Sequence, residues 1–324
     1  MRVTVTGATG LLGPAVIAEL RAAGAQVTVL SRNPERARSR LGVQALRWDP
    51  MSEPAPVEAL AGRDAVLHLA GENVAQRWTP EAKRAIRESR VTGTRHLIEG
   101  LRATGASAST SVSPTDVSTS PRGASTSTEG RPGVLVSSSA IGYYGPHGEE
   151  PIDEEAPAGD DFLAGVCAAW EAEAERAREL GMRVVRVRTG VVLDRQGGAL
   201  AKMLPPFRLG IGGPVAGGGQ YMSWIHREDL VGMMICALER ESWSGPINAT
   251  APEPVSNRDF SRALGRALHR PSLLPVPGIA LRLLYGEMAE IVTTGARVVP
   301  AKPLVLGYQF RHPRLEEALR TALG

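Results

Sequence analysis

Short apolar runs alternate with helical patterns along the first 190 residues of the chain. The apolar runs predict strands over Arg2–Thr6, Gln26–Leu30, Gln44–Trp48, Ala65–Leu69, Gly133–Ser137 and Arg183–Thr189. Between them, a helical spacing of apolar positions predicts helices over Pro14–Ala23, Pro34–Leu41, Pro80–Arg102 and Asp161–Leu180. This alternation predicts an α/β fold in which a doubly wound parallel sheet carries helices on both faces.

The first predicted strand breaks into three glycines spaced three apart, and a helical pattern follows them. Gly7 allows a tight turn, Gly10 lets backbone N–H groups approach a pyrophosphate, and Gly13 lets the helix pack close to the sheet. The bound anion would lie at the positive end of that helix. We therefore predict a Rossmann-type dinucleotide site, with an ordinary glycine-rich turn as the alternative. The loop residues expected to contact the cofactor are Gly7, Thr9, Gly10, Leu11, Leu12 and Gly13.

The end of the second predicted strand indicates which dinucleotide binds. An NAD site usually places a carboxylate there to accept from the ribose 2′-hydroxyl, whereas this chain has Ser31 and Arg32. A hydroxyl and a guanidinium suit a 2′-phosphate, so the predicted cofactor is NADP(H). In the alternative interpretation, Arg32 merely begins the solvated helix Asn33–Arg40.

Beyond Thr189 the chain becomes glycine-rich, and pockets form in such irregular stretches near the carboxyl ends of parallel strands. A strand over Met222–His226 follows. A short strand near Ile247–Ala249, a helix over Ser256–Leu268, an apolar segment over Gly278–Ile291 and a final helix over Pro313–Leu323 would make a small C-terminal α/β cap. We predict that residues 1–193 and 223–250 form the NADP-binding domain, and residues 194–222 and 251–324 a substrate-pocket subdomain.

Residues 105–132 interrupt the alternation before the fifth strand. More than half of the residues from Ser107 to Thr128 are Ser or Thr, and almost none is apolar. Such a segment buries too little surface to offset the entropy lost on ordering, so we predict a disordered surface insertion. A regulatory phosphorylation loop is the alternative.

Composition narrows the class of protein further. With 43% hydrophobic and 22% charged residues, the 324-residue chain is typical of a soluble globular protein. The net charge of +3 is slight and the arginines are dispersed, so nucleic-acid binding is not indicated. The two cysteines are far apart and predict no metal site. The N-terminus shows no leader pattern and no apolar run approaches about 18 residues, so we expect a cytoplasmic protein without membrane contact.

Three motifs resemble the extended short-chain dehydrogenase/reductases, the epimerase/dehydratase-like group. They are the loop Thr6–Gly13, the segment Leu67–Gly71 and the segment Ser137–Gly145, which resembles the active-site motif after the fifth strand. Ala70–Asn73, Cys167–Glu171, Trp224–His226 and the tail from Val276 to Phe310 resemble an atypical branch, the epimerase family proteins related to short-chain dehydrogenase/reductase family 39U. The resemblance implies a Rossmann fold and NADP(H) binding, but no established substrate.

The chain departs from that family in its acid/base machinery. Extended members use a Tyr-x-x-x-Lys pair on the helix after the fifth strand, where this chain has Val166 and Trp170. A family asparagine falls at Arg90, and only the serine survives, at Ser139. We expect Trp170 to fill the space of the missing lysine as a pocket wall. The resemblance thus leaves the proton donor unassigned.

The candidate catalytic residues are Ser139, which would orient a carbonyl, and Tyr143 and Tyr144, the nearest phenols. Packing at the pocket floor is the alternative for both tyrosines. Glu72 is assigned either to the cofactor or to a solvated loop, and Arg188 is expected at the nicotinamide end. The remaining residues expected to contact the cofactor are Leu69, Ala70, Gly71, Ser137, Thr189 and Val191.

Two further expectations concern structure. His226 precedes an acidic pair and is interpreted as a structural helix cap. Glu171 begins a charged stretch whose acids and arginines are expected to form a solvated helix face. A homodimer through the helices flanking the fifth strand is implied by the resemblance, with ordinary core packing as the alternative.

These observations support two functional hypotheses. The first is an NADP(H)-dependent, epimerase/dehydratase-like oxidoreductase that acts on a small-molecule substrate through a rearranged acid/base. The second is an NADP(H)-bound sensor or assembly protein without turnover, motivated by the missing Tyr and Lys. Composition does not separate them.

Overall fold

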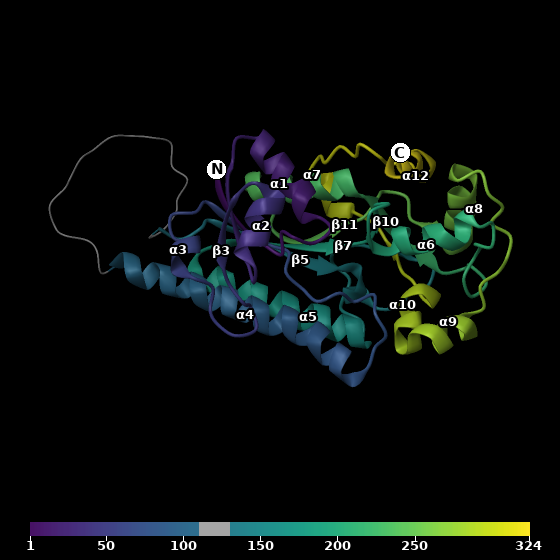
Figure 1. The fold of residues 1–324 in the computed structure, drawn as a ribbon, viewed down its shortest axis with the longest axis horizontal. Coiled ribbons are helices and arrows are strands. Elements are labelled where there is room, and N and C mark those ends of the chain that lie inside the picture. Colours follow the sequence, from purple (N-terminus) through teal and green to yellow (C-terminus); the bar gives the residue numbers. More distant parts are fainter. Residues whose placement is uncertain (110–129) are drawn as a thin grey trace.

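The centre of the computed structural model, which describes residues 1–109 and 130–324, is a seven-stranded sheet in the order β3-β2-β1-β4-β5-β7-β11 (Figure 1). All six pairings in this sheet are parallel, as predicted. Its strands are β1 (Arg2–Thr6), β2 (Gln26–Ser31), β3 (Gln44–Arg47), β4 (Ala65–His68), β5 (Val134–Ala140), β7 (Arg183–Thr189) and β11 (Gly245–Ala249).

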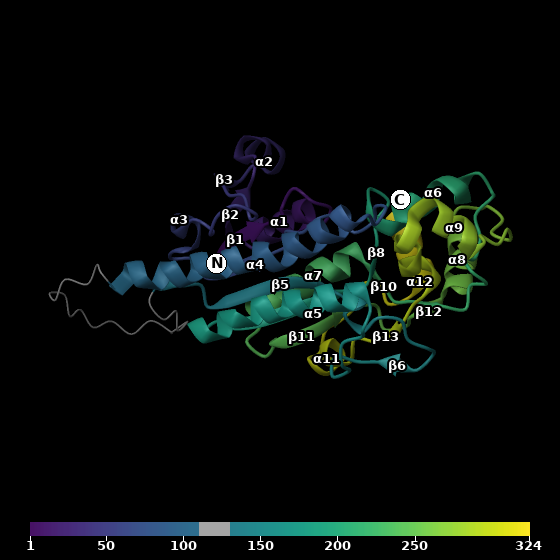
Figure 2. The same cartoon turned by 90° about the horizontal axis from the view of Figure 1, so that it is seen from below.

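Helices cover both faces of the sheet, and each face has its own apolar cluster (Figures 1 and 2). One face carries α1 (Gly13–Ala22), α2 (Pro34–Leu41) and α7 (Arg227–Glu239). The other carries α3 (Val57–Leu60), α4 (Pro80–Ser109) and α5 (Phe162–Glu175), and α4 and α5 lie alongside each other. Because both faces are covered, most residues of these strands are buried, and the strands are rich in valine and other apolar residues, which is why the sequence pattern predicts them well.

The chain adds strands to the sheet in two opposite directions from β1. Strands β2 and β3 lie on one side of β1, and strands β4, β5, β7 and β11 lie on the other. The direction therefore reverses between β1 and β4. Ligands of open α/β sheets bind in the crevice outside the carboxyl ends of the strands at such a reversal. The loops after β1, β2, β4 and β5 all emerge at that edge. The topology therefore brings the predicted cofactor and catalytic residues to one side of the molecule.

The remaining elements gather beyond this edge (Figure 1). They include α6 (Gly198–Arg208), α8 (Asn257–Ala267), α9 (Gly278–Tyr285), α10 (Glu290–Thr293) and α12 (Leu315–Leu323), whereas α11 (Ala301–Val305) packs against the edge strand β11. The 3-10 helices are η2 (Ile141–Tyr144), η3 (Arg176–Leu180) and η4 (Gly286–Ala289). Three small sheets pair β8 (Val191–Leu193) with β10 (Trp224–His226), β9 (Tyr221–Met222) with β12 (Val255–Ser256), and β6 (Pro151–Ile152) with β13 (Arg297–Val298).

Several element predictions were wrong in ways that packing explains. The strand near Ile247, which the element pattern assigned to the cap, is the edge strand β11 of the central sheet and pairs with β7, so it lies with the segment 223–250 of the predicted NADP-binding domain. The glycine-rich stretch contains α6, which buries Leu200, Leu204 and Phe207. The strand predicted over 222–226 is interrupted at Ser223, whose Oγ accepts from the Val298 N–H at 2.8 Å and donates to the Ala296 carbonyl at 2.8 Å.

The predicted insertion was also partly wrong. Helix α4 continues to Ser109, so residues 105–109 are helical. Thr104 is buried and donates its hydroxyl to the Gly100 carbonyl one turn earlier, at 2.9 Å, so a hydroxyl is accommodated within the helix. Residues 110–129, the rest of the Ser/Thr-rich segment, lie outside the described residues.

Candidate functional site

The loop between β1 and α1 requires glycine at two positions. Gly7 has a φ of +68°, and a Cβ there would lie 2.5 Å from the Leu69 carbonyl carbon. A Cβ on Gly13 would lie 1.9 Å from the Ala8 carbonyl oxygen. Gly10 closes the turn by donating its N–H to the Gly7 carbonyl at 3.0 Å. The backbone thus passes close to β4 and to itself, as the predicted cofactor loop requires.

The N-terminus of α1 is open to an anion. Its capping residue Leu12 supplies no side-chain acceptor, and no acidic residue lies in the first turn. The first N–H groups of the helix therefore have no partner within it, and they carry the positive end of its dipole. The carbonyl of Thr9 accepts from the Arg40 guanidinium at 3.0 Å, and Leu11 lies against Gly197. Both contacts fix the loop from outside.

The residues after β2 present an uncommitted cation. Arg32 is exposed and forms no hydrogen bond or ion pair with the described residues, although its charge contributes to a lowered pKa of Asp49. The N-cap of α2 is Asn33, which accepts from the Arg36 N–H at 3.0 Å, so Arg32 is not needed to begin the helix. Ser31 accepts from the Asn33 N–H at 3.2 Å.

The chain after β4 forms the next part of this edge. The backbone of Leu69 and Ala70 lies against Gly7. Glu72 is exposed, its N–H donates to Ser89 Oγ at 2.9 Å, and its carboxylate accepts from Gln76 Nε2 at 3.5 Å. The carboxylate of Glu72 is therefore held loosely, beside the crevice.

A buried ion pair lies beneath the carboxyl end of β5. Glu171 accepts from Arg188 Nε at 2.8 Å through Oε1 and from Arg188 Nη2 at 2.9 Å through Oε2. Ser139 Oγ donates to Glu171 Oε1 at 2.7 Å, and none of the three residues is more than 4% exposed. The prediction that Glu171 begins a solvated helix face was wrong, because α5 turns this residue toward β7, where the arginine side chains meet it.

Tyr144 belongs to the same network. It is fully buried, its hydroxyl donates to Asn248 Oδ1 at 2.7 Å and accepts from Arg188 Nη1 at 2.9 Å. Burial raises the pKa of Tyr144 to about 12. Its phenol is thus neutral and fully engaged, an arrangement typical of a structural residue.

Tyr143 is placed differently. It is half-buried, its ring lies 3.5 Å from the Arg188 guanidinium carbon, and its hydroxyl forms no hydrogen bond with the described residues. The structure therefore brings all three predicted catalytic residues, Ser139, Tyr143 and Tyr144, around Arg188. Only the hydroxyl of Tyr143 remains uncommitted among them.

The other predicted cofactor residues also end at this edge. Ser137 is buried in β5 beside His68 of β4. Thr189 is half-buried at the end of β7, and Val191 opens β8, its N–H donating to the Ser223 carbonyl at 2.8 Å. At the positions of the missing pair, Val166 and Trp170 are 1% and 5% exposed.

The partners that complete the buried network were not predicted from the sequence. Glu154 accepts from the backbone N–H groups of Asn248 at 2.8 Å and Lys302 at 3.1 Å, which joins the sheet to α11. Burial raises the pKa of Glu154. No local pattern distinguishes Glu154 from its exposed neighbours, since the backbone donors come from distant segments. The alternation of Arg186 and Arg188 on a strand was the one available signal for a buried acid opposite.

His226 is the N-cap of α7, as predicted, and its Nδ1 accepts from the Glu228 N–H at 3.2 Å. Its ring lies 3.8 Å from that of His312, which contacts Glu228 at 3.0 Å. These three side chains are near enough to share a metal ion. However, the cap occupies Nδ1 as an acceptor, which leaves the proton on Nε2 and opposes metal binding there.

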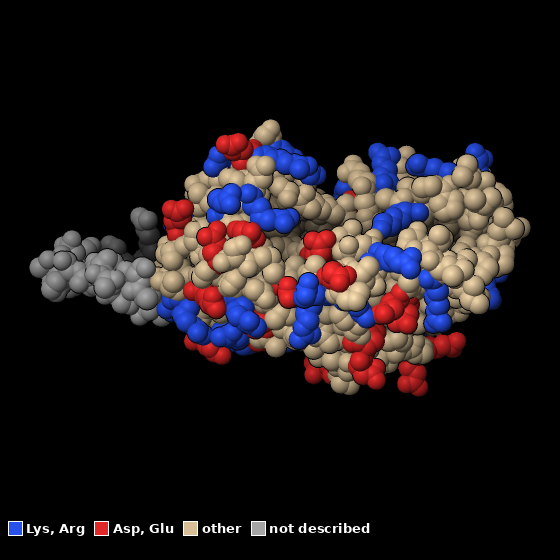
Figure 3. Space-filling model, turned by 60° about the horizontal axis from the view of Figure 1, so that its bottom comes forward, with Lys and Arg blue, Asp and Glu red and all other residues tan. Residues whose placement is uncertain are grey.

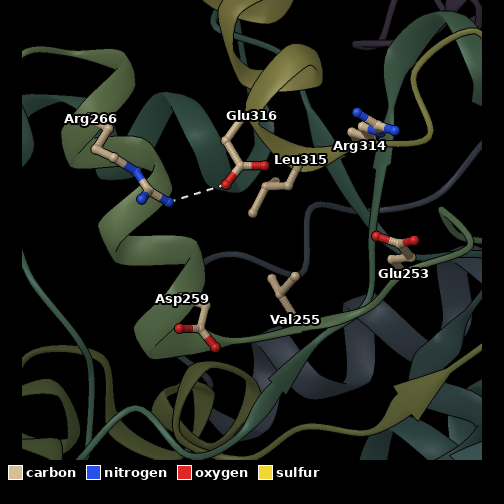
Figure 4. Close-up of a pocket in the computed structure, with 7 residues that line it drawn as sticks. All are labelled: Glu253, Val255, Asp259, Arg266, Arg314, Leu315 and Glu316. Atoms are coloured by element: carbon tan, nitrogen blue, oxygen red, sulfur yellow. Dashed lines mark hydrogen bonds and ion pairs between the residues drawn. The ribbon is translucent and has the colours of Figure 1, made fainter.

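Surface charge and surface hollows distinguish the cofactor edge of the sheet from the other pockets of the molecule. On the face drawn in Figure 3, both signs of charge are interspersed, and the surface is hollowed where the part built on the central sheet meets the C-terminal elements. A pocket of about 330 Å³ lies between α8 and α12, where Arg266 and Glu316 pair at 3.1 Å (Figure 4). Three acidic and two basic residues line this pocket, and it contains none of the predicted site residues. No helix among residues 1–109 and 130–324 has the length and apolar character to cross a membrane.

Comparisons with known proteins show the family and the fold. Residues 3–249 match the model of the NAD dependent epimerase/dehydratase family, and residues 276–322 match a domain of unknown function, DUF1731. The chain is 38% identical to the chloroplastic epimerase family protein SDR39U1 homolog of Arabidopsis thaliana, over 100% of this chain and 87% of the relative. It is 38% identical to the epimerase family protein Mb2239 of Mycobacterium bovis, over 98% and 96% of the two chains. A crystal structure of human epimerase family protein SDR39U1 (isoform 2) with NADPH is similar with a TM-score of 0.83, at 34% identity and 100% coverage of both chains.

Proposed function

The chain belongs to the NAD dependent epimerase/dehydratase family, and from this membership we propose that it binds NADP(H) and acts as an epimerase/dehydratase-like oxidoreductase on a small molecule. The observation that carries the proposal is the close packing at Gly7 and Gly13, which shapes the β1–α1 loop around an open helix N-terminus. The human relative crystallised with NADPH supports the same assignment.

The preference for NADP(H) rests on Arg32. Its guanidinium lies at the end of β2, is exposed and has no partner among the described residues, so it is available to a 2′-phosphate. Neither position 31 nor position 32 carries a carboxylate that would accept a hydrogen bond from the 2′-hydroxyl of an unphosphorylated ribose. Arg32 and Ser31 would hold the 2′-phosphate, and the N–H groups of residues 11–13 would hold the pyrophosphate.

For the proton transfer we propose Tyr143. Nicotinamide supplies the hydride chemistry when it is bound, and reduction of a carbonyl also needs a proton donor at the substrate oxygen. The hydroxyls of Ser139 and Tyr144 are engaged with Glu171, Asn248 and Arg188, whereas that of Tyr143 is not. Arg188 lies against the Tyr143 ring and positions it.

A second candidate function is an NADP(H)-bound sensor or assembly protein without turnover. Val166 and Trp170, both buried, occupy the positions of the usual Tyr and Lys, and neither side chain transfers a proton. This candidate shares the cofactor site with the first and differs only in chemistry.

Cytoplasmic location and a homodimer stay predictions, and the plant relative is named chloroplastic.

Oxidation of NADPH, screened over aldehydes, ketones and nucleotide sugars, distinguishes the two candidates. We expect turnover by the wild type and a loss of about 10²-fold or more in Tyr143→Phe, the contribution typical of a general acid. Thermal unfolding of the same variant serves as the control and should not change. If NADPH binds but no compound is turned over above background, the enzyme assignment is contradicted and the sensor is favoured.

A further inference from the structure

Arg90 carries donors that the protein does not use. It is half-buried on α4, and its Nη1 donates to the carbonyls of Glu72 at 3.0 Å and Ile86 at 3.1 Å. Its Nε and Nη2 form no hydrogen bond, and its guanidinium no ion pair, with any described residue. Burial lowers the pKa of Arg90, but a guanidinium remains charged in proteins.

Trp170 lies beside this cation and has an unused donor of its own. The Arg90 guanidinium carbon is 5.1 Å from the centre of the Trp170 ring. Trp170 is only 5% exposed, and its Nε1 has no acceptor among the described residues. A buried N–H without an acceptor is unfavourable, so an acceptor supplied by a ligand would be bound favourably.

The pair lies at the crevice edge of the sheet. A Cβ on Gly71 would be 3.2 Å from the Arg90 guanidinium carbon, which places the guanidinium directly against the chain that leaves β4. Gly7 lies against the preceding residue, Ala70, so the subsite adjoins the proposed cofactor groove. Arg32 follows β2, on the other side of β1, so Arg90 lies toward the half of the groove that faces the reaction.

We propose that Arg90 and Trp170 form an anion-binding subsite beside the cofactor groove that takes a carboxylate or phosphate group of the small-molecule substrate. The proposal rests on the proposed function for the identity of the groove. A half-buried cation without a carboxylate partner is matched by an anion, and the indole N–H adds a second, neutral donor. The nearest acid, Glu72, is exposed, and its carboxylate contacts Gln76 and not Arg90.

Anion titrations of matched variants test the subsite. Malonate and inorganic phosphate are titrated by calorimetry into the protein with and without saturating NADPH, and the Trp170 indole N–H resonance is followed by NMR. Arg90→Met and Trp170→Phe are compared with Arg87→Met, an exposed arginine on the same helix. Trp243→Phe is the second control, because Trp243 is also buried with an unpartnered Nε1 but lies against Tyr308.

We expect at least one probe to bind, to shift the Trp170 resonance, and to bind about tenfold or more weakly in Arg90→Met and about threefold or more weakly in Trp170→Phe. Both controls should remain within about twofold of the wild type. Absence of binding by both probes, or equal loss in variants and controls, overturns the subsite.

The cofactor is an alternative source of the bound oxygens, and a further titration distinguishes it. NADPH and adenosine 2′,5′-bisphosphate, which lacks the nicotinamide half, are titrated into the same variants. If Arg90→Met weakens NADPH alone and leaves the anion probes unchanged, the donors hold the cofactor and the substrate subsite is refuted. If the wild type does not bind NADPH, the proposed function fails, while the titration without NADPH still decides the subsite.

Discussion

Glu171 and Arg188 are the two residues that hold the buried network together. The Glu171 carboxylate meets Arg188 twice, Ser139 once and Arg186 at 3.1 Å, at 3% exposure. Removing the charge leaves the buried Arg188 without its anionic partner, which is far more costly than loss of an exposed pair. The network therefore fixes the position of Arg188, and the Arg188 guanidinium in turn positions the Tyr143 ring.

We predict that Glu171→Gln lowers the free energy of unfolding by about 3 kcal/mol, because it breaks a buried ion pair. Glu179→Gln is the control, since the Glu179 side chain is 62% exposed and, among the described residues, its carboxylate pairs only with Arg102. That change should cost at most about 1 kcal/mol. Urea unfolding measures both variants, and an equal cost would contradict the role assigned to Glu171.

The neighbouring tyrosines should respond in opposite ways to the same change. Tyr144→Phe removes hydrogen bonds to Asn248 and Arg188 and should lower the free energy of unfolding by about 1–3 kcal/mol. Tyr143→Phe removes no hydrogen bond to a residue that the structure describes, so it should leave stability unchanged while it lowers turnover. Unfolding and NADPH oxidation, measured on both variants, would contradict the assignment if the pattern were reversed.

At the scale of elements, His68 joins β4 to its neighbours. Its ring contacts Thr6 Oγ1 of β1 at 2.7 Å and Thr94 Oγ1 of α4 at 3.1 Å, and it is completely buried. Desolvation lowers the pKa of His68 to about 4. The unfolded chain therefore binds a proton more readily than the folded one between about pH 6.5 and 4.

Stability should consequently fall as pH decreases through that window. The contribution of neutral His68 to stability is fully present above the unfolded pKa of about 6.5. For His68 the loss is on the order of 3 kcal/mol when complete. A His68→Gln variant should be less stable at pH 7 but lose less stability on acidification. Urea unfolding at pH 7 and pH 4.5 measures the stability of both proteins. If the variant and the wild type lose the same stability between these pH values, the role assigned to His68 is contradicted.

The glycine loop provides a second test at element scale. Gly13→Ala places a methyl group against the Ala8 carbonyl, so the loop must shift and NADPH should bind at least about tenfold more weakly. Gly165→Ala on α5 is the matched control, since a Cβ there meets nothing within 4 Å and favours helix by up to about 1 kcal/mol. Weakened NADPH binding in Gly165→Ala but not in Gly13→Ala would refute the loop geometry.

Over the whole molecule, the sequence predicted best what depends on local pattern. The strands of the central sheet were predictable because they are mostly buried and rich in valine, and the β1–α1 loop because its glycines lie at fixed spacing. Helix α6 was not predictable, because Gly197–Gly198 and Pro205–Pro206 are unfavourable in a helix although the segment buries three apolar residues. The burial of Glu171 and Glu154 depends on arginine and backbone donors from distant segments, which no local pattern reports.

The most direct test of the whole account is calorimetric titration of NADPH and NADH into the wild type and Arg32→Asp. We expect the wild type to bind NADPH at least about tenfold more tightly than NADH, because a charge-assisted contact to the 2′-phosphate is worth about 1.5–3 kcal/mol. In Arg32→Asp this preference should disappear or reverse. If the wild type binds neither dinucleotide, or if the preference is unchanged in the variant, the account of the cofactor site is contradicted.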